Sequence, residues 1–417
     1  MRCISCITPI QNGRSRFCHD DHCLDTDLVQ EAIHNFWQVD EIILCIQDPR
    51  SASIAATCES RGIPVRKLWI PAGTNEAELW ETFSLLATLA DEGEEILFDI
   101  TDGRDSLPFI ISLVATWMKE VRKVKIVGVI YASPPDEFGL RHFINLQPIL
   151  QVIDWIEGVR ALISHTNAEQ MAELLTGLQG QIYRSGNEDD PPTRLKGWSH
   201  LLETFTTAIR LSRPVDALYA GWGIIHDLPR IRGEISRFAP VLLPVIKDLE
   251  IIGEMAALPS PDHLTPSYLR NQHRLIRYQI NKGFNLQAVS LGREWIISLM
   301  MLRFGIDDDW LDADSRHLIA RTMTGLALTM QGIPAETTQY THLLLSEVHW
   351  NAMMPIWERV SALRNDLAHC GMNRRNDSLK SLLQRINQIP DDLILFAAYT
   401  GVKFPETDKA PGADSEI

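Results

Sequence analysis

Short apolar runs and amphipathic stretches alternate over the N-terminal part of the chain. Runs of the kind that form buried strands lie at residues 2–10, 41–46, 65–70, 95–100 and 125–131. Stretches with helical periodicity lie between them, at residues 25–37, 53–60, 76–91 and 107–120. Strands that alternate with helices of this length predict an α/β domain, with a Rossmann-like, mostly parallel sheet and helices on both faces.

The pattern changes to helical periodicity after a last short strand at residues 141–146. A helical stretch at 149–178 is followed by a polar, acidic segment with two prolines at 183–195, which is typical of a linker or an exposed loop. Helical repeats then continue to about residue 400 and predict an all-α domain. The pattern therefore predicts four parts: an α/β domain (1–147), a helical connector and linker (148–195), a helical domain (196–403) and a disordered tail (404–417).

The loops that follow the first and fourth strands are the candidate ligand site of the α/β domain. In such sheets ligands bind at the carboxyl ends of the strands. Gly13 and Gly103 allow a ligand to approach the backbone, and the helix starts after residues 25 and 106 would present N–H groups to an anion. The candidate ligand-binding residues are Pro9, Gln11, Asn12, Asp99, Thr101, Asp102, Gly103, Arg104 and Ser106.

The alternative interpretation of the second loop is purely structural. Asp99, Thr101 and Asp102 would then cap the next helix, and Gly103 would make the turn. The chain has no Walker A sequence and no GxGxxG sequence, so an ordinary nucleoside triphosphate or dinucleotide site is not expected.

The candidate catalytic site is the polar cluster that ends an apolar helical run beginning at Trp350. Apolar residues recur at three- and four-residue steps along one helix face, and Gly371 is a helix stop. Asn365 and His369 are four residues apart and share a side of the helix. Arg364 lies about 140° around the helix from His369, so the two cannot form one tight pair within a chain. Arginine binds phosphate oxygens in a fork and histidine moves protons near neutral pH, which suits a phosphodiester. The alternative is a solvated helix end without catalysis.

The composition limits the kinds of binding partner that the chain is expected to have. The formal net charge of −15 argues against sequence-blind binding to duplex nucleic acid, although a small basic site can still engage a few phosphates. No apolar run is long enough to span a membrane, and the N-terminus leads into an apolar strand rather than a signal peptide. A cytoplasmic location is therefore expected, with no membrane partner.

The seven cysteines are expected to be reduced thiols. A zinc site could be imagined from the residues Cys3, Cys6, Cys18, His19, His22 and Cys23. However, Cys3 and Cys6 lie three residues apart in a predicted strand and so point to opposite faces. No metal site is therefore expected.

The order of the two domains, with Arg-Asn-x-x-x-His at the end of the second, resembles the CRISPR-associated ribonucleases that join a CARF sensor domain to a HEPN nuclease domain. The resemblance spans residues 2–390 approximately. Its other pieces are residues 70–81, Phe98-Asp99-Ile100-Thr101 with Gly103 and Ser106-Leu107-Pro108, Asp154-Trp155, Gln287-Ala288 and Arg293-Glu294. The chain departs from the family in the fourth-strand loop, where Asp102-Gly103-Arg104-Asp105 replaces a His-Gly-Phe-Arg run.

The resemblance implies metal-independent cleavage of single-stranded RNA, activated by a cyclic oligoadenylate and needing no cofactor. It implies a homodimer or higher homo-oligomer in which both Arg–His motifs line one groove. His369 would take the proton of a ribose 2′-OH, and the His369 of a second copy would protonate the leaving 5′-oxygen. Arg364 would neutralise the charge on the phosphorane and Asn365 would orient the imidazole or the phosphate. The products would carry 2′,3′-cyclic phosphate and 5′-OH ends.

Three other functions stay open at this point. The chain could be a cyclic-nucleotide sensor or adaptor that binds RNA or protein without cutting. It could also be a sensor that degrades its own cyclic oligoadenylate, or a toxin-like nuclease with a different small-molecule switch.

Overall fold

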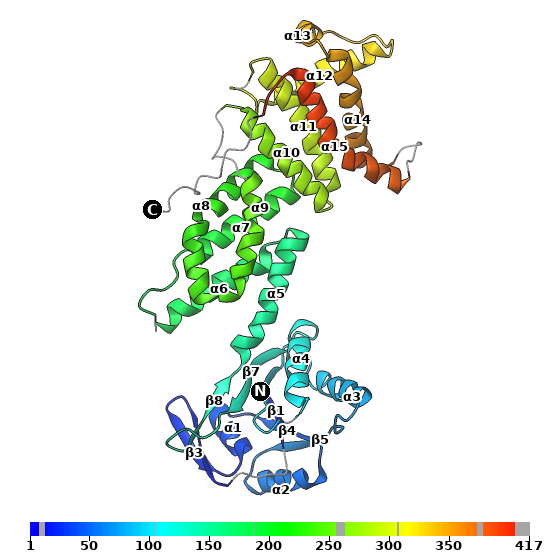
Figure 1. Cartoon of the computed structure of the whole chain (residues 1–417). Coiled ribbons are helices and arrows are strands. Elements are labelled where there is room, and N and C mark those ends of the chain that lie inside the picture. The colour runs from blue at the N-terminus through cyan, green and yellow to red at the C-terminus, as the bar shows by residue number, and fades with distance from the viewer. Residues whose placement is uncertain are drawn as a thin grey trace. The chain divides into compact units, whose positions relative to one another are not determined.

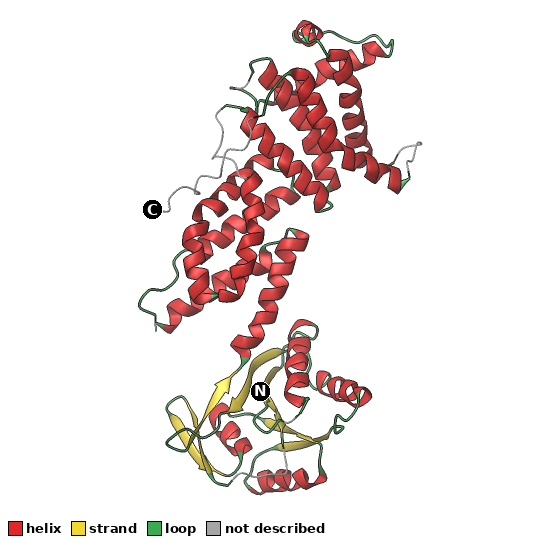
Figure 2. Ribbon diagram, in the orientation of Figure 1, coloured by secondary structure: helices red, strands yellow, loops and turns green. Residues whose placement is uncertain are grey.

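The computed structural model describes residues 1–7, 13–103, 105–186, 188–255, 263–306, 308–372 and 378–404. The chain divides into two compact units, Met1–Asp154 and Trp155–Ile417. The boundary falls inside helix α5 (Gln147–His165). The described part of the first unit combines strands and helices, whereas that of the second unit is helical throughout (Figure 2).

Eight strands of the first unit form one mixed sheet, in the order β3-β2-β8-β7-β6-β1-β4-β5 (Figure 1). Five adjacent strands run parallel to one another: β1 (Arg2–Cys6), β4 (Glu41–Ile46), β5 (Val65–Trp69), β6 (Glu95–Asp99) and β7 (Lys125–Ala132). The remaining three are β8 (Leu140–Asn145), antiparallel to β7, and the hairpin of β2 (Ser15–His19) and β3 (His22–Thr26). The order β5-β4-β1-β6-β7 is that of a doubly wound sheet.

Both faces of this sheet are covered, because its parallel strands are apolar on both sides. One buried cluster joins the sheet to α1 (Val29–Trp37) and α2 (Ala52–Ser60). The other joins it to α3 (Glu76–Ala87) and α4 (Leu107–Glu120). Cys3 belongs to the first cluster and Cys6 to the second, so their side chains do point to opposite faces.

The hairpin corrects two sequence-based expectations. The helix predicted from residue 25 begins only at Val29, because Asp25 lies in β3. A two-residue turn, Asp20-Asp21, lets the short, partly polar strands pair, and Asp20 takes a left-handed φ of 50°. Cys18 and Cys23 face each other across the hairpin and form a disulfide, so the expectation that every cysteine is reduced is wrong for these two.

The second unit consists of helices around one continuous core that contains Trp295, Trp357 and Phe396. After α5 come α6 (Glu169–Ser185), α7 (Leu195–Arg210), α8 (Pro214–Phe238), α9 (Leu243–Met255), α10 (Pro266–Asn281), α11 (Asn285–Arg303), α12 (Ala313–Met330), α13 (Thr341–Ser346), α14 (Trp350–Ala368) and α15 (Leu379–Thr400). The described residues also form two single turns of 3-10 helix, η1 (Pro49–Ser51) and η2 (Pro240–Leu242). The stretch predicted as one helix at 149–178 is two helices, interrupted near Thr166, whose φ is 51°.

None of the described helices combines the length and the apolarity that crossing a membrane requires.

Candidate functional sites

The carboxyl ends of β1 and β6 lie side by side in the sheet. Ser5 of β1 pairs in register with Asp99 of β6, and β4 pairs along the opposite edge of β1. The strand order therefore reverses at β1, and in doubly wound sheets ligands bind at the carboxyl ends of the strands at this point. The two loops predicted to hold a ligand start at this point.

Asp99 is the anchor of the second loop. It is fully buried and accepts hydrogen bonds from Ser5 Oγ (2.6 Å), from the Thr101 backbone N–H (2.9 Å) and from Thr101 Oγ1 (2.6 Å). Burial raises the pKa of Asp99, and the hydrogen bonds from Ser5 and Thr101 oppose that shift. Thr101 Oγ1 also accepts from the Ala132 backbone N–H at 2.9 Å. Both predicted ligand residues thus use their polar side-chain atoms to hold the loop to the sheet.

Gly103 and Ser106 shape the surface of the same loop. The Gly103 N–H donates to the Ile100 carbonyl at 2.9 Å, and a Cβ at residue 103 would lie 2.9 Å from Pro108 Cγ. Ser106 precedes α4 without a side-chain cap on that helix, so its first N–H groups are not covered by a capping side chain. Asp102, Gly103 and Ser106 are all partly exposed. The loop can therefore offer these three residues, and the start of α4, to an anionic ligand.

A third loop, which follows β5, lies at this edge of the sheet. None of its residues was predicted to bind the ligand. Gly73, in the loop after β5, has a φ of 78°, and a Cβ there would lie 3.4 Å from Ser106 Oγ. Gln47, just after β4, donates to the carbonyls of Pro71 (3.1 Å) and Ala72 (3.5 Å) and fixes that loop. The signal in the sequence is the glycine in the loop after the third predicted strand, because a φ of this sign favours glycine.

Four of the predicted ligand residues, Pro9, Gln11, Asn12 and Arg104, lie outside the described residues. The helix start expected after residue 25 is displaced by the hairpin, since α1 begins at Val29 with Leu28 as its N-cap. That helix start therefore does not follow the first-strand loop directly, as the sequence had suggested.

The second candidate site is the end of α14, where the expected helix is present from Trp350 to Ala368. The face formed by Met353, Ile356, Trp357, Val360 and Leu363 is buried, as its spacing predicts. α14 packs against α11, α12 and α15. This packing fixes the axis of the helix and hence the directions in which its last residues point.

The helix ends in a Schellman motif that holds His369 at the C-cap. The Gly371 N–H donates to the Asp366 carbonyl at 2.9 Å, and the Cys370 N–H donates to the Leu367 carbonyl at 3.1 Å. Cys370 and Gly371 have left-handed φ values of 58° and 67°. Gly371 therefore helps to stop the helix, as predicted, although Cys370 occupies the position that glycine usually takes.

Arg364, Asn365 and His369 present three different polar groups at this helix end. Arg364 is half-buried and donates from Nη1 to Asn365 Oδ1 at 3.3 Å, whereas Asn365 and His369 are exposed. Within the described part of the chain, the His369 imidazole has no hydrogen-bond partner. A guanidinium that grips an anion and an exposed imidazole that exchanges protons are the groups that metal-free phosphodiester cleavage requires.

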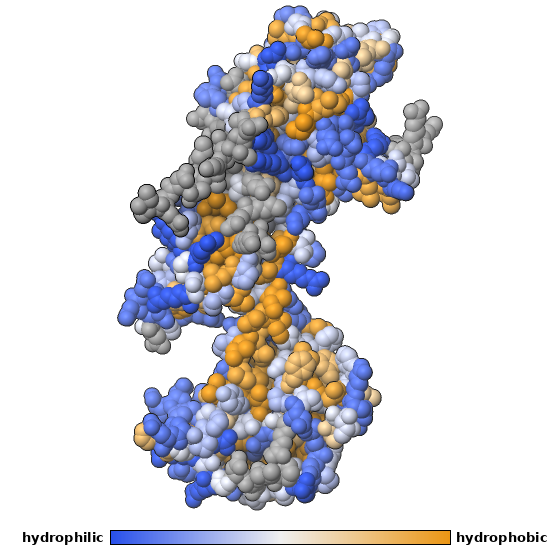
Figure 3. Space-filling view, viewed as in Figure 1, coloured by the Kyte–Doolittle hydropathy of each residue, from blue (hydrophilic) through white to orange (hydrophobic). Residues whose placement is uncertain are grey.

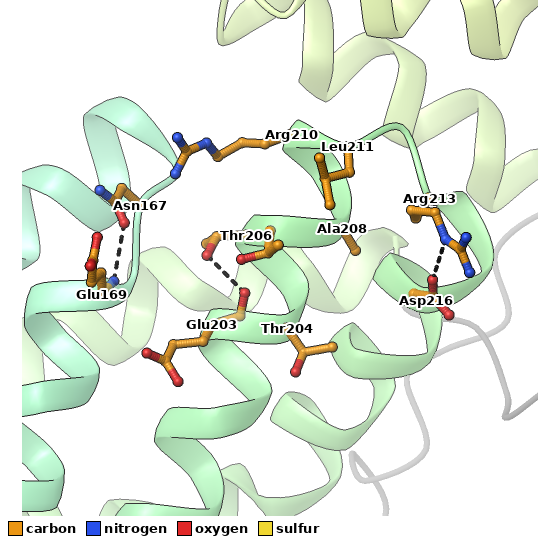
Figure 4. A pocket seen from close by; sticks show the side chains of 11 residues that line it. Asn167, Glu169, Glu203, Thr204, Thr206, Ala208, Arg210, Leu211, Arg213 and Asp216 are labelled. Carbon is orange, nitrogen blue, oxygen red and sulfur yellow. Dashed lines mark hydrogen bonds and ion pairs between the residues drawn. The ribbon is translucent and has the colours of Figure 1, made fainter.

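A cavity of 720 Å³ lies elsewhere in the second unit, among α6, α7 and the start of α8 (Figure 4). Glu169 and Glu203 line it, and Arg213 at its edge is paired with Asp216 at 2.7 Å. Arg210 reaches across its mouth toward Asn167. This cavity contains none of the predicted site residues.

The described residues contain no group of three or more His, Cys, Asp or Glu side chains that could hold a metal ion. In the hairpin, Cys18 and Cys23 are bonded to each other, and His19 instead stacks on Trp37 with ring centroids 4.2 Å apart.

No family model matches the chain. Over 178 residues, which are 42% of the chain, it is 26% identical to the CRISPR-associated protein MJ1674 of Methanocaldococcus jannaschii. The matched region is 23% of that protein, so the chain spans less than a quarter of the relative's length. The chain is thus similar to a CRISPR-associated protein over part of its length.

Proposed function

We propose that this protein is a CRISPR-associated endoribonuclease whose α/β unit binds a cyclic oligoadenylate and whose helical unit cleaves single-stranded RNA without a metal. The observation that carries the proposal is the set of Arg364, Asn365 and His369 on the capped end of α14. The neighbouring carboxyl ends of β1 and β6 and the similarity to a CRISPR-associated protein support it. In the terms of the resemblance drawn from the sequence, the two units would be a CARF sensor and a HEPN nuclease.

In this proposal the chemistry follows from the three side chains. His369 removes the proton from a ribose 2′-OH, which attacks the adjacent phosphorus. Arg364 stabilises the negative charge that grows on the phosphorane oxygens, and its contact with Asn365 holds the guanidinium at the helix end. A second imidazole, from the His369 of another copy, protonates the leaving 5′-oxygen. The products carry 2′,3′-cyclic phosphate and 5′-OH ends, and DNA is not cut because it lacks the 2′-OH.

An apolar ridge on α4 supports self-association of the α/β unit. Its residues, Phe109, Leu113, Trp117 and Val121, follow one another at four-residue steps and are 43–68% exposed. Exposed Ile149 and Val152 continue the apolar surface on α5, over which hydrophobic residues gather in Figure 3. A ligand with two-fold symmetry suits a site shared by two copies.

In the sensor, the ligand would lie over Gly73, Asp102, Gly103 and Ser106, with its phosphates at the start of α4. Asp102 replaces the histidine that the resembling family carries, and a carboxylate is suited to accept hydrogen bonds from ribose hydroxyls rather than to face phosphate. To activate cleavage, the ligand must bind the active arrangement more tightly than the resting one.

The test is an RNA cleavage assay on the purified full-length protein in EDTA, with cyclic oligoadenylates of several ring sizes. We expect His369→Ala to lower the cleavage rate at least about 100-fold, because general acid–base catalysis contributes that much, and to leave activator binding unchanged. The matched control is His317→Ala, which removes another exposed histidine of the same unit. Undiminished cleavage by His369→Ala, or cleavage that EDTA abolishes, would show that the proposed chemistry is wrong.

A further inference from the structure

The β2–β3 hairpin carries a disulfide directly behind its turn. Cys18 and Cys23 pair across the two strands, and the turn between them is Asp20-Asp21 flanked by His19 and His22. Cys18 is only 1% exposed, whereas Cys23 is exposed at the surface. One sulfur of the bond is therefore on a residue that solvent and small thiols can reach, which is typical of labile rather than permanent disulfides.

The hairpin has other means of staying folded. Aromatic rings pack around it from α1 and β8: Phe17 stacks on Phe143 at 5.9 Å, and Trp37 contacts Phe143 at 5.1 Å and His19 at 4.2 Å. The loop that the bond closes is short, with a sequence separation of 5, so the bond restricts the unfolded chain less than one that closes a longer loop. We therefore do not expect loss of the bond to unfold the hairpin, and its effect should instead be on the register and rigidity of β2.

A continuous set of contacts leads from β2 to the sensor loop. Cys18 itself pairs with His142 of β8, and the neighbouring pair is Phe17 with Arg141. The Arg141 guanidinium lies over the Phe17 ring, 5.1 Å from its centroid, and donates to the carbonyls of Ser133 (2.9 Å) and Ala132 (3.3 Å).

The backbone of Ala132 is the last link between β2 and the predicted ligand loop. Its N–H donates to Thr101 Oγ1 at 2.9 Å, and Thr101 holds Asp99 at the start of the predicted ligand loop. A change in the position of β2 can thus reach the loop through packed and hydrogen-bonded groups alone.

We propose that the Cys18–Cys23 pair is a reversible thiol–disulfide site that sets the ligand affinity of the α/β unit, with the oxidised form binding more tightly. This inference rests on the proposed sensor function. Disulfides that do occur in reducing compartments are usually transient or redox-sensing, which agrees with this role.

The chemistry is thiol–disulfide exchange with a small thiol, R–SH. Its thiolate attacks Cys23 Sγ, the S–S bond breaks, and Cys18 leaves as a thiolate that takes up a proton. A second R–SH resolves the mixed disulfide, so two R–SH are oxidised to R–S–S–R while the protein gains two thiols. Oxidised glutathione reverses the reaction.

The experiment compares the full-length protein after treatment with oxidised glutathione and after treatment with dithiothreitol. Affinity for labelled cyclic oligoadenylates and hydrogen exchange of the backbone amides of residues 99–103 and 105–106 are measured on both forms. We expect reduction to weaken ligand binding about fivefold or more, which is the lower end of ordinary allosteric coupling, and to speed exchange of the Thr101 amide. Cys18→Ser should behave like the reduced form in either treatment, and Cys370→Ser, which removes an exposed free thiol, should respond like the wild type.

The two measurements separate this inference from the function on which it rests. If no cyclic oligoadenylate binds either form, the sensor proposal fails and with it the claim about affinity, while faster exchange on reduction would still support the connection to the loop. Binding that is identical in the two forms, or exchange that does not change, would overturn the inference. A mass spectrum showing free Cys18 and Cys23 thiols after oxidised glutathione treatment would overturn it as well.

Discussion

At the end of α14, residues close in sequence differ in burial and in what their side chains contact. Leu363 is buried and fixes the helix to the core, Arg364 is half-buried beside Asn365, and His369 is exposed at the cap. The side chains differ in exposure because they lie on different sides of one helix. The imidazole can thus reach solvent and substrate while the guanidinium is held by a neighbour.

Replacing Cys370 by glycine should stabilise the helical unit. Cys370 has a φ of 58°, where a Cβ costs about 1–2 kcal/mol, and the greater freedom of glycine in the unfolded chain offsets part of the gain. We expect Cys370→Gly to raise the free energy of unfolding by about 0.5–1 kcal/mol. Cys370→Ala, measured in the same denaturant titration, is the control, because it removes the thiol and keeps the Cβ. Equal stability of the two variants would show that the Cβ of residue 370 causes no measurable strain.

Stability of the helical unit should fall in mild acid because of His273. Burial lowers the pKa of His273, and its Nε2 lies 2.9 Å from the Pro390 carbonyl of α15. The folded state therefore binds fewer protons than the unfolded state. The contribution of neutral His273 to the free energy of unfolding is therefore fully present above the unfolded pKa of 6.5. It is lost as the pH falls through the lower pKa of His273 in the folded state.

The pH effect is measurable by urea unfolding between pH 7.5 and 5. The slope should reach at most about 1.4 kcal/mol per pH unit, which is the limit for one proton. His273→Gln keeps a hydrogen-bond donor but does not titrate, so its stability should change less over the same range. Parallel curves for the wild type and this variant would rule out His273 as the source.

Among the elements, α11 and α12 are joined by one arginine. Arg316 of α12 donates to Ser298 Oγ (3.0 Å), to the Trp310 carbonyl (2.9 Å), and to the Glu294 carbonyl (3.0 Å) and Oε2 (2.9 Å). Its side chain is 17% exposed. Because α14 packs on both helices, the Arg316 hydrogen bonds also stabilise the surface against which the candidate catalytic helix packs.

Arg316→Lys should lower the free energy of unfolding by about 2–3 kcal/mol, because an ammonium cannot reach all four acceptors and leaves some without a donor. Arg321→Lys on the same helix is the matched control. Its ion pair with Glu336 is exposed, with side chains 51% and 85% accessible, so its loss should cost less than about 1 kcal/mol. If the two variants lose similar amounts of stability in thermal unfolding, the Arg316 contacts do not hold α11 and α12 together as proposed.

The molecule as a whole depends, in our proposal, on pairing of two copies. In that proposal the leaving-group acid is the His369 of a second copy, and the apolar ridge of α4 is a surface on which copies can associate.

Leu113→Lys should therefore weaken both association and RNA cleavage, because it buries a charge in the ridge. We expect sedimentation to show monomers at concentrations where the wild type is dimeric, with cleavage reduced in proportion. Val348→Lys is the control, since Val348 is 84% exposed in the other unit. A Leu113→Lys protein that still forms dimers would remove the ridge from the proposed interface.

The sequence determined those features that depend on local periodicity. The five parallel strands, the helices α2, α3 and α4, and α14 with its buried face lie close to where their spacing placed them, because burial of an apolar stripe follows directly from side-chain order. The stop at Gly371 was equally local, since a left-handed φ favours glycine.

Only the tertiary structure decided which distant residues meet. The register of Ser5 with Asp99 turned Asp99 from a surface candidate into a buried anchor, and Gly73 joined the site from a loop that the sequence left aside. The edge hairpin, with its Cys18–Cys23 bond, was missed because its strands are short and partly polar, and their pairing is stabilised by packing against α1 and β8. Strand pairing and burial are set by contacts between segments far apart in the chain, which local periodicity does not record.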